Sequence, residues 1–232
     1  ATLLHHINGV KDARIRGRLH LAFTAIIPYA SILRRFRSDR KGGGPLSGTL
    51  YVASIITPPN VMMSYQRNIK FISDAFSTAH LLGPNSIGAS SANNSLKVLS
   101  NTVDYVFVDP PFGSNLMYSE LNFLWEAWLR VLTNNEYEAV INRSQRKTLS
   151  EYQAIMESCF KEFYRVLKPG RWMTVEFHNS QNAVWNAIQD AILRAGFMVA
   201  DVRTLDKQQG TFKQVSSTAA VKQDLVISVY KP

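Results

Sequence analysis

The sequence predicts an α/β fold around a mostly parallel β-sheet whose last strand is antiparallel. From residue 103 onward, short apolar runs alternate with segments of helical periodicity in the order β-α-α-β-α-β-β. Alternation of this kind indicates parallel strands with helices packed on the faces of the sheet. Only a polar loop separates the last two predicted strands, and a connection without a helix favours antiparallel pairing.

The N-terminal part is predicted to begin with a helix over residues 17–38, where apolar residues recur at helical spacing and Pro28 should introduce a kink. After a basic loop, residues 49–56 (TLYVASII) are rich in β-branched and aromatic residues, which is typical of a strand. A helix is expected from about residue 61 to 76. The polar stretch 77–102 has room for a short strand near Ile87.

The second half of the chain has clearer signals. The predicted elements are strand 103–109, helix 118–132, helix 150–167, strand 172–178, helix 182–195 and strands 197–205 and 225–230. Ser150 and Gln153 predict a capping box at the start of the second of these helices. The turn Lys168-Pro169-Gly170 should stop that helix, and Gly196 should close the next one.

Composition indicates a globular protein in a reducing compartment. The 232 residues are 46% apolar, which supports one domain with a full core. The single cysteine, Cys159, excludes a disulfide framework and a cysteine-built zinc site, and its apolar neighbours favour a core thiol. No apolar run approaches the roughly 20 residues that span a membrane. The single cysteine and the lack of a membrane-spanning run together predict a cytoplasmic protein. The five histidines lack metal-ligand spacing, so we expect no metal site.

The net charge of +9 is concentrated near the N-terminus. Between residues 11 and 41, nine lysines and arginines face two aspartates, an excess of +7. We therefore divide the chain into a basic helical segment, 1–48, and a main region, 49–232. Clustered cations favour a polyanion through counterion release, although a solvated basic face would have the same composition. The expected nucleic-acid contacts are Arg34, Arg35, Arg37, Arg40 and Lys41, joined by Arg143 and Arg146 from the second half.

The motif Asp109-Pro110-Pro111-Phe112 directly follows the predicted buried strand. In open parallel sheets, ligands bind beyond the carboxyl ends of the strands, so the motif lies where a site is expected. Two successive prolines fix the backbone and remove two amide donors, which leaves nearby carbonyl groups free to accept hydrogen bonds from a ligand. A rigid turn without a chemical role is the simpler alternative.

These groups suit methylation of the exocyclic amino group of a nucleic-acid base. That nitrogen is a poor nucleophile because its lone pair is delocalised into the ring. Asp109 and the Pro110 carbonyl could each accept one N–H, localise the lone pair and direct it in line at a sulfonium methyl group. Phe112 could stack on a base that is flipped out of the helix, and Tyr118, after the following polar loop, could also reach it.

Other aromatic and histidine side chains allow two interpretations. Phe123, Trp125 and Trp128 recur at helical spacing, which favours a place in the core over base stacking. His178 ends a predicted strand at the same sheet edge as Asp109. It could line a base pocket or, together with Asn179, cap the following helix.

The motif resembles the Asp-Pro-Pro-Tyr/Phe motif of the amino-methylating DNA methyltransferases, which modify adenine at N6 or cytosine at N4. The stretch 109–121 with Trp128-Leu129 is similar to the catalytic loop and helix of that family, and 165–170 and 195–197 are similar to its later turns. Residues 19–76 resemble a segment of large bacterial adenine-specific methylases. The resemblance implies a Rossmann-like methyltransferase sheet, DNA as substrate, and S-adenosylmethionine as cofactor, contacted by Asp109 and Pro110. It favours adenine over cytosine because the motif begins with Asp rather than Ser.

One part of the family pattern is not found. Such enzymes bind the cofactor through a glycine-rich loop after the first strand and an acid after the second. Here Gly42-Gly43-Gly44 is the only glycine cluster, and it follows Arg40-Lys41 rather than a strand. We therefore expect an incomplete sheet whose cofactor loop belongs to an upstream domain or a second subunit. A ribosomal RNA guanine-N2 methyltransferase and a non-catalytic nucleic-acid-binding subunit or fragment are the alternatives.

Overall fold

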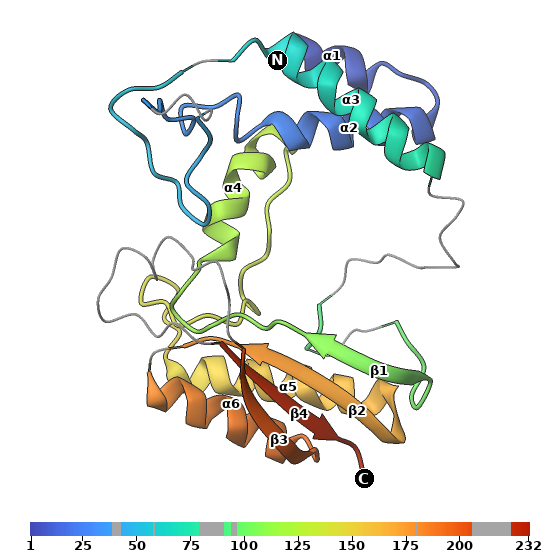
Figure 1. Ribbon diagram of the computed structural model, residues 1–232, viewed down its shortest axis with the longest axis vertical. Helices are drawn as coiled ribbons and strands as arrows, with labels where there is room; N and C mark the ends of the chain where they lie inside the picture. Colours follow the sequence, from blue (N-terminus) through green and yellow to red (C-terminus); the bar gives the residue numbers. More distant parts are fainter. Residues whose placement is uncertain (39–42, 58, 79–90, 94–96, 180, 206–223) are drawn as a thin grey trace. The chain divides into compact units, whose positions relative to one another are not determined.

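The computed structural model describes residues 1–38, 43–57, 59–78, 91–93, 97–179, 181–205 and 224–232 (Figure 1). The chain forms two compact units. Unit 1 comprises Ala1–Ile87 and Tyr118–Thr133, and unit 2 comprises Gly88–Met117 and Asn134–Pro232. The strand expected near Ile87 and the predicted contacts Arg40 and Lys41 lie outside the described residues.

Unit 1 is helical. It contains α1 (Thr2–Asn8), α2 (Ala13–Ile26), α3 (Val61–Thr78) and α4 (Tyr118–Leu129). Asp12 begins α2, because its Oδ1 accepts hydrogen bonds from the amides of Arg14 at 2.8 Å and Ile15 at 3.1 Å. The small core of the unit consists of Ile7, Ala22, Phe23, Ile26, Ile27 and Tyr65.

Two predictions for unit 1 are wrong, and one is wrong in part. Helix α2 ends at Ile26 instead of continuing through a kink, because Pro28 offers no amide and the chain turns after it, with Ser31 Oγ donating to the Pro28 carbonyl at 2.7 Å. Residues 49–56 form only an isolated bridge, between Arg35 and Ile56, since no described strand lies beside them. Of the predicted core aromatics on α4, Trp125 packs against the core, whereas Phe123 is exposed and Trp128, whose ring contacts Phe23 edge-to-face, is 41% exposed.

Unit 2 is built on a four-stranded sheet. The strands are β1 (Val103–Val108), β2 (Leu167–Phe177), β3 (Met198–Leu205) and β4 (Asp224–Tyr230), in the order β1-β2-β4-β3. β1 pairs with β2 in parallel, and β4 is antiparallel to both of its neighbours. Three of the four strands therefore run in one direction and the last is reversed, as predicted.

Helices α5 (Leu149–Val166) and α6 (Asn182–Arg194) cover one face of this sheet (Figure 1). Alternate residues of β2, namely Met173, Val175 and Phe177, point to these helices and are buried with them in the main core. The Lys-Pro-Gly turn was expected to precede β2. It instead lies within β2, because Leu167 already pairs with Val103.

The capping box of α5 also lies earlier than predicted. Thr148 and Glu151 form it, rather than Ser150 and Gln153: the Thr148 side chain accepts from the amide of Ser150, and Glu151 Oε2 accepts from the amide of Thr148 at 2.8 Å. The hydrogen bonds from Thr148 lower the pKa of the Glu151 carboxyl. Both residue pairs fit the sequence pattern, so spacing alone could not decide between them.

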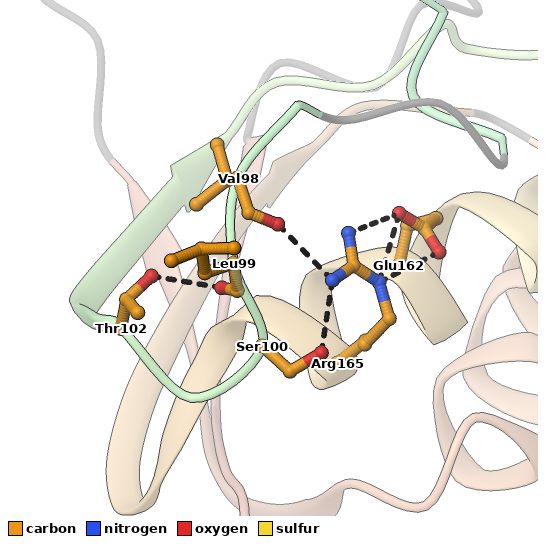
Figure 2. Close-up of polar contacts among 6 residues, drawn as sticks. All are labelled: Val98, Leu99, Ser100, Thr102, Glu162 and Arg165. Carbon is orange, nitrogen blue, oxygen red and sulfur yellow. Dashed lines mark hydrogen bonds and ion pairs between the residues drawn. The ribbon is translucent and has the colours of Figure 1, made fainter.

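Arg165, in the last turn of α5, fixes the chain that leads into β1 (Figure 2). Its Nη1 donates to the Val98 carbonyl and to Ser100 Oγ, each at 3.0 Å, while Nε and Nη2 bind the Glu162 carboxylate. The amide of Thr102 then donates to the Val166 carbonyl at 3.0 Å. These contacts fix the position of the chain just before β1. The motif follows directly at the other end of this strand.

The face of the sheet opposite the helices carries aromatic side chains. Tyr105 on β1 pairs with Trp172 on β2, which pairs with Tyr230 on β4, which pairs with Met198 on β3. We call Tyr105, Trp172 and Tyr230 the aromatic row. Tyr105, Trp172 and Met198 are 54%, 46% and 49% exposed, and the Trp172 and Tyr230 rings are 5.4 Å apart. No described element of unit 2 covers this face, and β1 is an edge strand.

Candidate active site

Asp109 follows the last residue of β1, at the carboxyl end of the strand. Its side chain is exposed, whereas Pro110 is buried and Pro111 and Phe112 are half-buried. The packing of Pro110 and Pro111 restricts the backbone next to Asp109, and β1 restricts the backbone before it. The predicted motif therefore offers a carboxylate to solvent from a fixed position.

The backbone after Asp109 is held by three hydrogen bonds to three successive carbonyl groups. Tyr152 Oη on α5 donates to the Pro111 carbonyl at 2.6 Å, and Asn179 Nδ2 donates to the Phe112 carbonyl at 3.0 Å. The amide of Ile141 donates to the Gly113 carbonyl at 3.2 Å. In the part of the chain that the structure describes, no hydrogen bond reaches the carbonyl of Pro110.

Gly113 allows the loop to lie this close to its supports. Its φ of +70° lies in the left-handed region, which a side chain would strain. A Cβ at this position would lie 3.3 Å from Ile141 Cδ1 and 3.5 Å from Asn179 Nδ2. The glycine thus permits both the turn and the hydrogen bond that Asn179 makes.

The Phe112 ring packs against the end of β2. It makes edge-to-face contacts with Phe177, at 5.3 Å between ring centres, and with His178, at 6.1 Å. His178 Nδ1 lies 2.5 Å from Oδ1 of Asp224, a buried carboxylate at the start of β4. The predicted alternative that His178 caps α6 is therefore wrong, because its ring is paired with Asp224. Asn179 contributes at that end through its Oδ1, which accepts from the amide of Gln181 at 2.7 Å.

Arg143 and Arg146 lie on an exposed turn beside the motif loop. The turn is closed by paired backbone hydrogen bonds between Asn142 and Lys147, each 2.9 Å long. It is tied to the motif loop by the Ile141–Gly113 hydrogen bond and by a contact of 3.1 Å from Asn142 Nδ2 to Met117 Sδ. Both arginines are exposed, so they are available to phosphate groups near Asp109.

Lys147 makes this turn rigid. Its buried Nζ donates to the carbonyls of Asn135 at 2.6 Å and Glu138 at 2.7 Å, and burial lowers the pKa of the ammonium group. Arg146 has a φ of +54°, a conformation uncommon for a side-chain-bearing residue. The turn is therefore held in one conformation with its arginines outward.

The remaining predicted contacts lie in unit 1. Tyr118 is the exposed first residue of α4, Arg34 and Arg35 are half-buried and Arg37 is exposed. The structure thus places Asp109, Pro110, Pro111 and Phe112 in one unit with Arg143 and Arg146. Sequence reasoning missed Tyr152, because a tyrosine on the buried face of a helix has the same pattern whether or not its hydroxyl group has a partner.

The structure gives little support for a cysteine nucleophile or a metal site. Burial raises the pKa of the Cys159 thiol to about 11, which excludes an activated thiolate nucleophile there. Among the described residues, no cluster of three or more histidine, cysteine, aspartate or glutamate side chains could hold a metal ion. None of the helices in the described ranges is long and apolar enough to cross a membrane.

The expected cofactor, S-adenosylmethionine, fits part of this site. Asp109 and Pro110 provide acceptors at the carboxyl end of a strand, where a nitrogen that receives a methyl group must be held. Within the described ranges, no strand runs directly into a Gly-x-Gly turn that would let the backbone approach the rest of the cofactor. Asp109 and Pro110 would therefore meet only the reactive end of the cofactor.

Comparison with known proteins gives one family. A family model described as DNA methylase, of the N6/N4 methyltransferases, matches residues 103–232. No curated protein matches the sequence. Similar solved structures include a Thermus thermophilus protein assigned as a DNA modification methylase, at 15% identity over 59% of this chain and 47% of that chain, with a TM-score of 0.34. The same protein complexed with S-adenosyl-L-methionine gives 14% identity, coverage of 59% and 50%, and a TM-score of 0.34.

Two further structures are similar to this chain. The [4+2]-cyclase SpnF has 13% identity over 72% of this chain and 64% of its own, with a TM-score of 0.40. The 16S rRNA (adenine(1408)-N(1))-methyltransferase of Catenulisporales acidiphilia has 15% identity over 61% and 60%, with a TM-score of 0.33. This chain spans about half the length of the Thermus protein.

Proposed function

The chain belongs to the DNA methylase family, and we propose that it transfers a methyl group to the exocyclic amino group of a DNA base, with adenine favoured over cytosine. Its sheet is the Rossmann-like sheet of S-adenosylmethionine-dependent methyltransferases, and S-adenosylmethionine is the cofactor of the family. The observation that carries the proposal is the exposed Asp109 side chain at the start of a fixed loop. The carbonyl groups of Pro111, Phe112 and Gly113 in this loop each accept a hydrogen bond.

In the proposed reaction, S-adenosylmethionine supplies an electrophilic methyl group. Asp109 accepts one N–H of the base amino group, and the Pro110 carbonyl accepts the other. These hydrogen bonds draw the lone pair out of the ring and orient it, so catalysis consists mainly of positioning. Phe112 offers the ring on which the flipped base would stack. Its contacts with Phe177 and His178 would fix that ring before the base arrives.

DNA would be held mainly through its phosphates. Arg143 and Arg146 are outward on a turn tied to the motif loop, so they suit phosphates close to the flipped base. In unit 1, Tyr118, Arg34, Arg35 and Arg37 remain candidates for contacts with the base or the duplex. The charge excess of +7 between residues 11 and 41 supports this, because sequence-independent DNA affinity comes mainly from phosphate neutralisation.

The rest of the cofactor site would come from an upstream domain or a second subunit. Parallel strands are normally covered on both faces, yet Tyr105 on β1, the strand that pairs in parallel with β2, is 54% exposed, and β1 is an edge strand of the described sheet. A strand added in parallel to β1 would end beside Asp109, and a glycine turn after it would face the motif. The same segment could cover Tyr105 and Trp172 with a helix.

Methyl transfer from labelled S-adenosylmethionine tests the proposal. The full chain is incubated with the donor at millimolar concentration and with either unmethylated DNA or ribosomal RNA. Label in DNA, lost on Asp109→Ala, supports the proposal. Label only in ribosomal RNA would favour the guanine-N2 alternative. DNA binding without label in either nucleic acid, even at high donor concentration, would favour a non-catalytic subunit.

A further inference from the structure

The loop that carries Asp109 is held from two elements far apart in sequence. Tyr152 lies within α5 and reaches the Pro111 carbonyl, while Asn179 follows β2 and reaches the Phe112 carbonyl. Tyr152 is fully buried, and its hydroxyl group donates at 2.6 Å. Both donors are side chains aimed at backbone acceptors, so they control the orientation of two consecutive peptide groups.

We propose that Tyr152 and Asn179 are positioning residues for methyl transfer. By holding the Pro111 and Phe112 carbonyls, they keep the Asp109 carboxylate and the Pro110 carbonyl at the separation that one amino group can bridge. The Pro110 carbonyl is left as the acceptor because the carbonyls after it already have donors. The inference rests on the proposed methylation of an amino group and adds the residues that set its geometry.

The chemistry of peptide groups explains why both residues are needed. The two prolines fix two φ angles but remove the amide donors that could anchor this stretch of backbone, so other groups must restrain its remaining rotations. Rotation of the peptide group between Pro111 and Phe112 would turn the preceding carbonyls away from a bound base. Misplacement of a reacting group by about 1 Å can cost on the order of a hundredfold in rate.

Two substitutions each remove the hydrogen bond to the motif loop with little change in shape. Tyr152→Phe deletes only the hydroxyl group. Asn179→Asp deletes the donor to the Phe112 carbonyl but keeps an oxygen that can accept from the amide of Gln181. Tyr164→Phe is the matched control. Tyr164 lies on the same helix, but its ring packs on Phe197, away from the motif loop.

The experiment follows the backbone ¹³C carbonyl resonances of Pro110 and Pro111 in the labelled full chain. Deoxyadenosine monophosphate is added as the probe, and deoxyinosine monophosphate, which lacks the amino group, as its control. In the native chain, deoxyadenosine monophosphate should shift the Pro110 resonance and leave that of Pro111 nearly unchanged. Tyr152→Phe and Asn179→Asp should each abolish the Pro110 shift, and Tyr164→Phe should retain it.

The outcomes separate this inference from the proposed function. A Pro110 shift of native size in both variants would overturn the positioning role while leaving the amino-group site intact. No shift in the native chain would overturn both, since there would be no base to position. In transfer assays, each variant should lower kcat roughly tenfold to a hundredfold with KM for DNA nearly unchanged, because the phosphate contacts proposed for Arg143 and Arg146 are retained. Thermal unfolding shows whether each variant is folded.

Discussion

Asp109 is the residue on which the proposed chemistry depends most. Asp109→Ala should lower the methyl-transfer rate by about 10²–10³, the usual cost of losing a hydrogen bond that orients a reacting group. The midpoint of thermal unfolding should change little, because the side chain is exposed at the end of β1. Turnover close to the native rate would show that another group holds the amino nitrogen.

Arg143 and Arg146 make a prediction about DNA binding. Replacing both with Ala should weaken binding to all sequences alike and reduce the slope of log K against log salt by about 2, since two phosphate contacts are lost. The control replaces Arg171 and Arg194, which are exposed in the same unit and bear the same charge but have no link to the motif loop. Equal losses in the two double variants would mean that only net charge matters.

The sequence identified the residues of the motif more readily than the side chains that hold the motif loop in place. Asp109 to Phe112 could be identified because two prolines after a strand-like run are a local signal. The hydrogen bonds from Tyr152 and Asn179 join residues 41 and 67 positions apart, and no local pattern encodes such contacts. The pairing of His178 with Asp224 escaped prediction for the same reason.

Among the elements, helix α5 offers a direct test of where a helix begins. Thr148→Ala should lower the free energy of unfolding by about 1 kcal/mol, the typical contribution of a threonine N-cap. Ser150→Ala, at the capping position favoured by sequence spacing, should have little effect, because Ser150 contributes its backbone amide to the cap. Denaturant unfolding of both variants measures the difference, and a larger loss for Ser150→Ala would contradict the observed cap.

The same cap predicts a dependence on pH. Hydrogen bonds from Thr148 lower the pKa of Glu151 in the folded state. A lowered carboxyl pKa contributes stability that is present above the ordinary glutamate pKa and is lost as the pH falls through the folded pKa. The stability difference between the native chain and Thr148→Ala, measured by denaturant unfolding across this range, should therefore shrink in acid.

The elements of unit 2 were predictable from sequence, whereas those of unit 1 were less so. Strands β1 to β4 and helices α5 and α6 each combine a clear period with a stop signal, such as Gly196 after α6 at φ +100°. Residues 49–56 have strand-like composition, but a strand also needs a partner, and that depends on the fold rather than on propensity. Pro28 ended α2 rather than kinking it because no packed helix follows to compensate for the lost hydrogen bond.

For the whole molecule, the described residues lead to a prediction about cofactor binding. The chain's described residues provide acceptors at the reactive end and no glycine turn after a strand. We therefore expect the chain alone to bind S-adenosylmethionine with a Kd of roughly millimolar, about −4 kcal/mol. Isothermal titration checks this. Micromolar binding by the isolated chain would show that a second part is not needed for the cofactor.

The central claim, methylation of an exocyclic amino group in DNA, is tested most directly by nucleoside analysis. DNA treated with the full chain and with methyl-labelled S-adenosylmethionine at a concentration above the expected millimolar Kd is digested, and the labelled nucleoside is identified by mass spectrometry. We expect labelled N6-methyladenine, and we expect none with the Asp109→Ala variant. Label on a ring carbon, such as C5 of cytosine, would contradict the proposal, because Asp109 and the Pro110 carbonyl are proposed to hold an amino group and the half-buried Cys159, whose thiol pKa is raised to about 11, is poorly suited to the covalent adduct that ring-carbon attack requires.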